Sequence, residues 1–183
     1  MSRGNMGKFI QLFFLVSILS ISGFPANPDV KFEYLTTVDG LPSNYINVIF
    51  QDSFGFLWFG TRNGLVRYDG YNFKIYQPEI SSYSISGRGI TSIHEDKNGN
   101  LWIGTDFNGL NKFDRKKERF IHFKHDPLDS TSLRSNNIWT CYLDSSGYLW
   151  VVYADFTPDI LNTTSGRVSP VQYGFDRSGI GRN

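Results

Sequence analysis

One short phrase occurs three times in this chain of 183 residues, and it constrains the fold more than any other feature. The copies read "FGFLWFGT" at Phe54–Thr61, "NGNLWIGT" at Asn98–Thr105 and "SGYLWVVY" at Ser146–Tyr153. Their tryptophans are 44 and 48 residues apart. A period of this length is typical of repeat architectures in which each copy is one supersecondary unit.

The residues around each tryptophan predict a tight hairpin. An Asp follows an apolar, alternating segment, and its side chain can bond the backbone two residues further on. A Gly three residues after the Asp can take positive φ and close the turn, and Leu-Trp then begins the second strand. In the first two copies Gly-Thr ends that strand. The recurring residues are Asp52, Gly55, Trp58, Gly60, Thr61, Asp96, Gly99, Trp102, Gly104, Thr105, Asp144, Gly147 and Trp150.

Two further short strands follow in each of the first two copies, which gives four antiparallel strands per repeat. The 30 aromatic residues and 18 glycines of the chain suit many short strands joined by tight turns. We therefore predict an all-β fold, a partial and open β-propeller of about three four-stranded blades. The expected divisions are an entry strand and loop at 30–44, repeats at 45–77, 88–126 and 136–175, and a tail at 176–183. The third repeat is degenerate, because Val152 and Tyr153 replace Gly-Thr.

The N-terminus has a different composition from the rest. Arg3 and Lys8 precede a 13-residue apolar run from Phe9 to Ile21, and small residues follow it. As a helix this run would reach about 20 Å, short of the roughly 30 Å of a hydrocarbon core. We expect residues 1–23 to be a signal peptide, cleaved near Ser22–Ala26, with an uncleaved membrane anchor as the alternative. Either interpretation places the remaining chain outside the cytoplasm.

The segment Asp39–Tyr76, "DGLPSNYINVIFQDSFGFLWFGTRNGLVRYDGYNFKIY", resembles the first two-component-regulator propeller repeat of Bacteroidetes hybrid sensors. The stretch "GITSIHEDKNGNLWIGTDFNGLNKFD" resembles the next repeat, and the similarity extends from about Phe32 to Trp150. The resemblance implies a periplasmic sensor region in which many such repeats precede a membrane span, a histidine kinase and a receiver. It also implies a response to glycans or their breakdown products. No span, kinase or receiver is present in this sequence.

No catalytic set stands out, and we predict no catalytic residue, metal or cofactor. The formal net charge of +1 gives no general electrostatic case for nucleic-acid binding. The lone Cys141 excludes an internal disulfide and is expected to be a buried small hydrophobe. His122 and His125 are expected to be exposed polar positions, and the basic run Arg115–Arg119 a solvated loop. Asp96-x-Asn98-x-Asn100 resembles a calcium loop, but its Gly is in the wrong position, so a turn is favoured.

Ligand-binding residues are expected in the loops that follow Gly-Thr, because propeller ligands tend to lie on a face built from loops. The candidates are Arg62, Asn63, Asp106, Phe107 and Asn108, whose planar polar groups and aromatic ring suit a sugar or its acid. The alternative is that these residues serve only as turn residues.

Three functions are compatible with the sequence. The first is the N-terminal part of a periplasmic sensor propeller, which senses a glycan-derived ligand or contacts another propeller. The second is an extracytoplasmic propeller enzyme such as a lyase, which would need a cluster of His or acids. The third is a structural protein-binding module or a non-functional remnant. An open arc would also expose apolar faces near Ile46–Phe50 and Ile138–Leu143, so association with other blades or with itself is expected.

Overall fold

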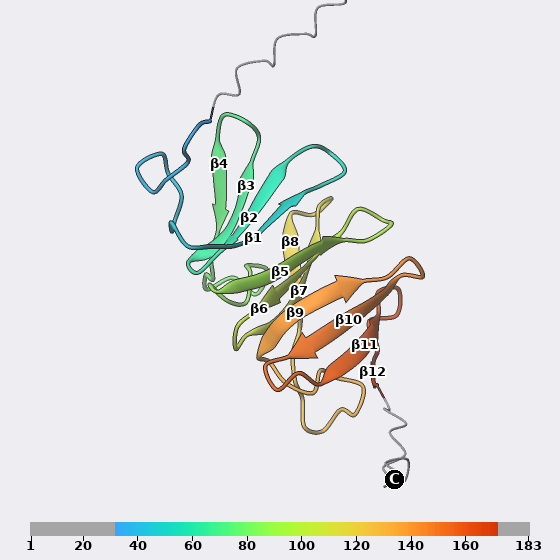
Figure 1. Ribbon diagram of the computed structural model, residues 1–183. Coiled ribbons are helices and arrows are strands. Elements are labelled where there is room, and N and C mark those ends of the chain that lie inside the picture. The colour runs from blue at the N-terminus through green and yellow to red at the C-terminus, as the bar shows by residue number, and fades with distance from the viewer. Residues whose placement is uncertain (1–31, 172–183) are drawn as a thin grey trace, which may run out of the picture. The chain divides into compact units, whose positions relative to one another are not determined.

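The computed structural model describes residues 32–171 and contains three four-stranded antiparallel sheets (Figure 1). The chain divides into two compact units, residues 1–34 and 35–183, and only Phe32–Tyr34 of the first is described. The expected signal peptide, its cleavage region and the tail lie outside the described residues. Within the described part there is no helix long and apolar enough to cross a membrane.

Each sheet is a meander whose strands pair in sequence order, as predicted for a propeller blade. Blade 1 contains β1 (Ile46–Gln51), β2 (Leu57–Thr61), β3 (Gly64–Tyr68) and β4 (Phe73–Tyr76). Blade 2 contains β5 (Ile90–Glu95), β6 (Leu101–Thr105), β7 (Gly109–Asp114) and β8 (Arg119–Phe123). Blade 3 contains β9 (Ile138–Leu143), β10 (Tyr148–Tyr153), β11 (Pro158–Asn162) and β12 (Val168–Pro170).

The pairing registers show that the three blades are built alike. Trp58 lies opposite Phe50, Trp102 opposite His94 and Trp150 opposite Tyr142, each at the same place on the first hairpin. The pairing of the first strand with the second is also irregular at the same place in each blade. The register shifts near the start of β1, β5 and β9, where each of these strands pairs with the end of the second strand. The repeat seen in the sequence therefore corresponds to one structural unit, including its irregularity.

The blades pack face to face through two apolar clusters. Trp58 of blade 1 packs with Ile90, Ile103 and Phe113 of blade 2, and its ring meets Phe113 edge-on at 5.6 Å between centroids. Trp102 of blade 2 packs in the same way against Leu149, Val151 and other apolar residues of blade 3. Both tryptophans have 0% of their surface exposed, which confirms that they occupy equivalent buried positions on the second strands. Burial on this scale makes each tryptophan the centre of a blade interface.

The first strands of the blades, β1, β5 and β9, lie next to one another along the arc (Figure 1). The loops after β2, β6 and β10 lie together on one side of it, at the left in Figure 1. The arc is open among the described residues, since no sheet follows blade 3 and none precedes blade 1.

Residues Phe32–Thr36 were expected to be an unpaired or loosely paired edge, and in the structure they adopt no strand conformation. They are exposed for the most part and pair with no described strand, and a strand needs the edge of a partner to complete its hydrogen bonds. The chain that follows does contribute to blade 1. Leu41 packs with Phe59 and Val66 on the side of blade 1 that faces away from blade 2.

Candidate functional site

The turn that begins each phrase is a small polar structure centred on one carboxylate. In blade 1, Oδ1 of Asp52 accepts hydrogen bonds from the backbone N–H groups of Phe54 (2.9 Å) and Phe56 (3.0 Å). Oδ2 accepts the indole N–H of Trp58 at 2.6 Å. The glycine of the turn, Gly55, has φ of 88°, as predicted for the closing position. One Asp therefore fixes both the turn and the orientation of the buried tryptophan.

The same arrangement recurs in the other blades. The indole N–H of Trp102 donates to Asp96 at 3.0 Å, and that of Trp150 donates to Asp144 at 3.2 Å. The backbone bonds at the turn were predicted, whereas the bond from tryptophan to Asp was not. Its sequence signal is an Asp six residues before each Trp, which the three copies share. These residues are structural and leave no group free for a ligand.

Arg115 joins blade 2 to blade 1, which corrects the expectation that its basic run is entirely solvated. Its guanidinium donates to Asp52 at 2.7 Å and to Glu95 at 3.0 Å, and it also donates to the Gly99 carbonyl. The guanidinium also stacks over the ring of Phe54, 4.9 Å from its centroid. The run differs from the expectation because the hairpin after β7 lies against the neighbouring turn, and only Lys116, Lys117 and Glu118 are exposed.

A pocket of about 480 Å³ opens at the loop side of the arc and receives residues from all three blades. This volume falls within the roughly 300–1,000 Å³ usual for ligand sites. The predicted candidates Arg62, Asp106 and Phe107 line it together. The residues that sequence reasoning missed are Asn47, Thr91, Asn137, Ile138, Trp139 and Ala154.

The lining follows the repeat. Asn47, Thr91 and Trp139 each occupy the second position of the first strand of their blade. Arg62, Asp106 and Ala154 each lie directly after the second strand, and their backbone N–H groups donate to Tyr45, Gly89 and Asn137 carbonyls respectively. The backbone hydrogen bonds are therefore the same in each blade. The side chains at the second position of the first strand and directly after the second strand differ between blades. Divergent positions in an otherwise repeated frame were therefore the sequence signal that could have located the remaining residues.

One group at this pocket has an unsatisfied hydrogen-bonding requirement. The hydroxyl of Thr91 is buried and has no hydrogen-bond partner among the described residues. This hydroxyl faces Gly104, because it lies 2.8 Å from the place that a Cβ on that glycine would occupy. Thr91 lies at the start of β5, between the contributions of blades 1 and 3.

Two exposed aromatic side chains flank the pocket. Phe107 is 71% exposed and has φ of 65°, a left-handed conformation that is uncommon for a bulky residue. Trp139 is 59% exposed and meets Phe156, itself at φ of 62°, edge-on at 6.0 Å. Strained backbone that presents an exposed aromatic ring is a feature of binding loops.

The other two predicted site residues do not line this pocket. Asn63 holds neighbouring loops together, because its amide donates to the Pro42 carbonyl at 3.2 Å and accepts from Arg88 at 3.0 Å. Asn108 accepts a bond at its carbonyl from Ser86 at 2.9 Å. The contacts of these two residues are therefore with neighbouring loops. Their position in the loop places them toward the segments that lead into β1 and β5.

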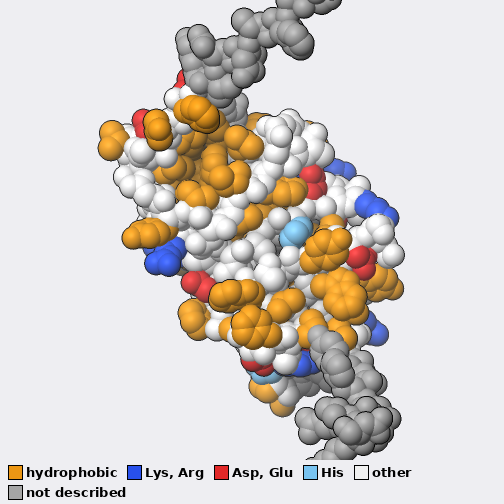
Figure 2. Space-filling view, viewed as in Figure 1, with side chains coloured by type: hydrophobic (Ala, Val, Ile, Leu, Met, Phe, Trp, Pro, Cys, Tyr) orange, Lys and Arg blue, Asp and Glu red, His pale blue; other side chains and the backbone are white. Residues whose placement is uncertain are grey.

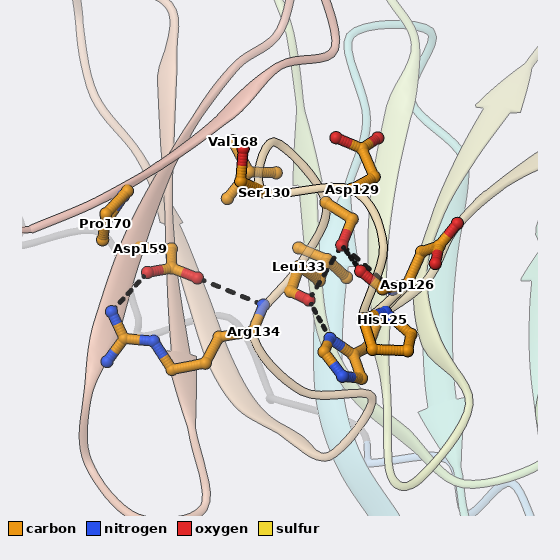
Figure 3. Close-up of a pocket in the computed structure, with 11 residues that line it drawn as sticks. His125, Asp126, Asp129, Ser130, Leu133, Arg134, Asp159, Val168 and Pro170 are labelled. Atoms are coloured by element: carbon orange, nitrogen blue, oxygen red, sulfur yellow. Dashed lines mark hydrogen bonds and ion pairs between the residues drawn. The ribbon is translucent and has the colours of Figure 1, made fainter.

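A second cavity, of about 250 Å³, lies between the segment before β9 and strands β11 and β12 (Figure 3). Figure 3 shows Arg134 and Asp159 pointing toward one another, with an ion pair of 2.9 Å. Asp159 also accepts the hydroxyl of Tyr153 at 2.8 Å, and His125 Nδ1 is 2.7 Å from the Leu133 carbonyl oxygen. The polar groups here satisfy one another, so this cavity is a structural junction of blade 3.

The remaining candidates have structural surroundings. His122 Nε2 lies 2.7 Å from the Ser84 carbonyl oxygen, and no group of three potential metal ligands occurs in residues 32–171. Cys141 is 4% exposed, as expected for a small buried hydrophobe. Its burial raises the pKa of the thiol to about 12, which makes it a poor nucleophile near neutral pH.

Parts of the chain are similar in sequence to known proteins. The family model described as two component regulator propeller matches residues 40–63, 84–107 and 132–154. A curated histidine kinase from Formosa agariphila is 46% identical over 80 residues, which cover 43% of this chain and 6% of that kinase. The matched segments contain the three hairpins with their Asp and Trp residues.

Solved structures extend the similarity to the fold. The extracellular domain of a putative hybrid two component system from B. thetaiotaomicron superposes with a TM-score of 0.71 and 30% identity. The superposition includes 76% of this chain and 20% of that extracellular domain. The extracellular domain of a putative one component system from the same organism gives a TM-score of 0.56 at 29% identity, over 67% of this chain and 17% of its own length.

The fold and the matches together identify the described part as a series of propeller blades. Segments of all three blades are similar to two-component regulator propeller repeats, and the fold is similar to the extracellular domains of putative two-component systems. The chain spans 6% of the curated kinase and 20% and 17% of the two solved extracellular domains.

Proposed function

We propose that this chain forms part of an exported sensor propeller and that its loop-side pocket binds a glycan-derived ligand. The propeller repeats and the extracellular location of the solved relatives support the sensor role and the export. The role is one of binding rather than catalysis, with the signal passed on by other parts of a two-component system.

The observation that carries the ligand-binding proposal is the composition of the pocket. It combines two amides, two charged groups and two exposed aromatic rings. Sugars present hydroxyl groups at their edges and C–H groups at their faces, so planar polar groups and aromatic rings suit both. The second cavity and the blade interfaces lack this combination of free groups.

The proposal is tested by saturation-transfer NMR on the full chain with mono- and oligosaccharides, comparing the parent with Trp139→Ala. We expect sugar signals with the parent and their loss in the variant. Tyr142→Ala is the matched control, because Tyr142 is also an exposed aromatic of β9, at 64%, but does not line the pocket. Equal signals in the parent and both variants, or none in the parent, would contradict the proposal.

Contact with other propeller blades is a second proposed role. Figure 2 shows hydrophobic side chains gathered over blade 1 and again over blade 3. Ile49 of blade 1 is 62% exposed, and Trp139 and Tyr142 of blade 3 are similarly exposed. Exposed apolar faces of this kind mark interaction surfaces. Sedimentation velocity of the full chain over a range of concentrations tests this role, since a monomer at every concentration would contradict self-association.

A further inference from the structure

Two opposite charges face the loop-side pocket without pairing with one another. Arg62 lies at the end of β2 and Asp106 at the end of β6, and both line the pocket. Among the described residues neither forms an ion pair, although six other ion pairs are present. Opposite charges attract, so Arg62 and Asp106 would pair if their side chains could reach one another. We infer that the backbone holds them too far apart to pair.

Contacts with blade 1 hold Arg62 in place. Its guanidinium stacks over the ring of Tyr45, 4.8 Å from the centroid, and its backbone N–H donates to the Tyr45 carbonyl at 3.4 Å. Stacking covers one face of the guanidinium and leaves its N–H edge available. That edge is the part of an arginine that binds a carboxylate through two parallel hydrogen bonds.

Asp106 is fixed in blade 2 by a glycine. Its backbone N–H donates to the Gly89 carbonyl at 3.0 Å, and its carboxylate lies where a Cβ on Gly89 would have to be. Gly89 therefore provides the space in which this carboxylate sits. No hydrogen bond from another side chain satisfies its oxygens among the described residues, so they remain free to accept hydroxyl groups.

Neutral polar groups lie on the same pocket wall. The Thr91 hydroxyl has no partner, and the amide N–H of Asn47 donates to the Ile90 carbonyl at 2.8 Å, which leaves its oxygen as an acceptor. Blade 3 contributes Ala154 at the position of Arg62 and Asp106, together with Trp139. The wall of the pocket is thus cationic at blade 1, anionic at blade 2 and uncharged at blade 3.

We propose that the ligand of this pocket is an acid sugar, with its carboxylate on Arg62 and its hydroxyl groups on Asp106. This inference rests on the proposed sugar-binding function and narrows it to one chemical class. The order of charges fits a ligand with one carboxylate and several hydroxyl donors. Ala154 and Trp139 at blade 3 suit the apolar face of the sugar ring.

Isothermal titration calorimetry on the full chain tests the inference with glucuronate and galacturonate against glucose and galactose. We expect the acid sugars to bind about tenfold more tightly, because one charge-assisted bidentate contact is worth that factor. Arg62→Gln should remove this preference, so that acid and neutral sugars bind the variant with similar affinities. Arg62→Lys keeps the charge without the planar edge and should retain only part of the preference.

Lys116→Gln is the control variant, because it removes one exposed positive charge outside the pocket and should leave the preference intact. Thermal melts of all variants show whether each is folded. Equal affinity for acid and neutral sugars in the parent would overturn the acid-sugar inference and leave the sugar-binding function standing. Absence of binding by all four sugars would overturn both.

Discussion

The two blade interfaces use the same tryptophan but hold the turn beside it in different ways. Between blades 1 and 2, Arg115 reaches across to Asp52, and Glu95 accepts hydrogen bonds from the Ser53 backbone and hydroxyl at 2.7 Å each. Between blades 2 and 3 these polar contacts are missing. The registers place Thr163 at the position of Arg115 and Leu143 at that of Glu95.

In the turn of blade 2, a residue of the same blade supplies the hydrogen bonds that blade 1 receives from its neighbour. Asn100 donates its amide to both oxygens of Asp96, at 3.1 and 3.0 Å, where blade 1 has Phe56. Thr163 donates its hydroxyl to the Gly147 carbonyl of its own blade at 2.7 Å, much as Arg115 donates to Gly99. A carboxylate that bonds a buried indole must have its oxygens satisfied, and either the neighbouring blade or the same blade can do so. The first interface therefore has an ion pair at its rim, whereas the second has none among the described residues and includes a contact of 2.7 Å between His94 Nε2 and the Cys141 carbonyl oxygen.

Blade 3 extends the comparison to a face that no described blade covers. Trp150 is only half-buried, whereas Trp58 and Trp102 are fully buried. Val152 replaces the glycines at positions 60 and 104, where the first isoleucine of the next blade approaches the backbone. A side chain is accommodated at Val152, which is only partly buried, because no described blade follows blade 3. The third copy of the phrase loses its ending at the position that the next blade would contact.

The largest difference is expected among the tryptophans. Trp102→Ala should lower the free energy of unfolding by about 3–5 kcal/mol, because a large buried side chain leaves a cavity. Trp150→Ala should cost about 1–2 kcal/mol, since less of its surface leaves water on folding. Urea denaturation of the full chain measures both. Equal losses would contradict the difference between the covered and uncovered faces.

A smaller effect is expected from exchanging glycine and valine. Gly60→Val should destabilise by about 3 kcal/mol, because its Cβ would lie 2.7 Å from Ile90 Cγ2 of the next blade and close to Val48. The reverse change, Val152→Gly, should cost about 1 kcal/mol through added chain flexibility. Thermal melts of the two variants compare the positions. A tolerated Gly60→Val would mean that blade 2 does not pack on blade 1 as described.

The smallest effect concerns the ionic rim. Arg115→Met should cost about 1–2 kcal/mol, a value reduced because Arg115 remains partly exposed. Burial alone would raise the pKa of Asp52, but hydrogen bonds from Trp58 and Arg115 outweigh it and hold the pKa below its ordinary value. This contribution to stability is present above the unfolded pKa of about 3.9 and is lost as the pH falls through the folded value.

Urea midpoints between pH 7 and pH 3 should therefore fall less steeply in Arg115→Met than in the parent. Lys117→Met serves as the control, because Lys117 lies in the same hairpin and only approaches Asp114 at 4.0 Å. Parallel pH profiles for the parent and Arg115→Met would show that the arginine does not act through Asp52.

Much of the fold could be predicted from the sequence because it depends on local chemistry that repeats. Asp52 and Gly55 identify a turn, and Trp58 identifies the strand that follows it, whatever surrounds them. The roles of Arg115 and Thr91 could not be predicted, because they depend on which blade lies next to which loop. For the same reason the sequence predicted Arg62, Asp106 and Phe107 for the pocket but gave no means of separating them from Asn63 and Asn108.

The stacked open arc is tested most directly by hydroxyl-radical footprinting of the full chain, with each tryptophan followed by mass spectrometry. The structure predicts strong labelling of Trp139, intermediate labelling of Trp150, and protection of Trp58 and Trp102, which are fully buried at the two interfaces. Labelling of Trp58 or Trp102 at the rate of Trp139 would contradict the stacking of the blades. Protection of Trp150 equal to that of Trp102 would contradict the uncovered face of blade 3.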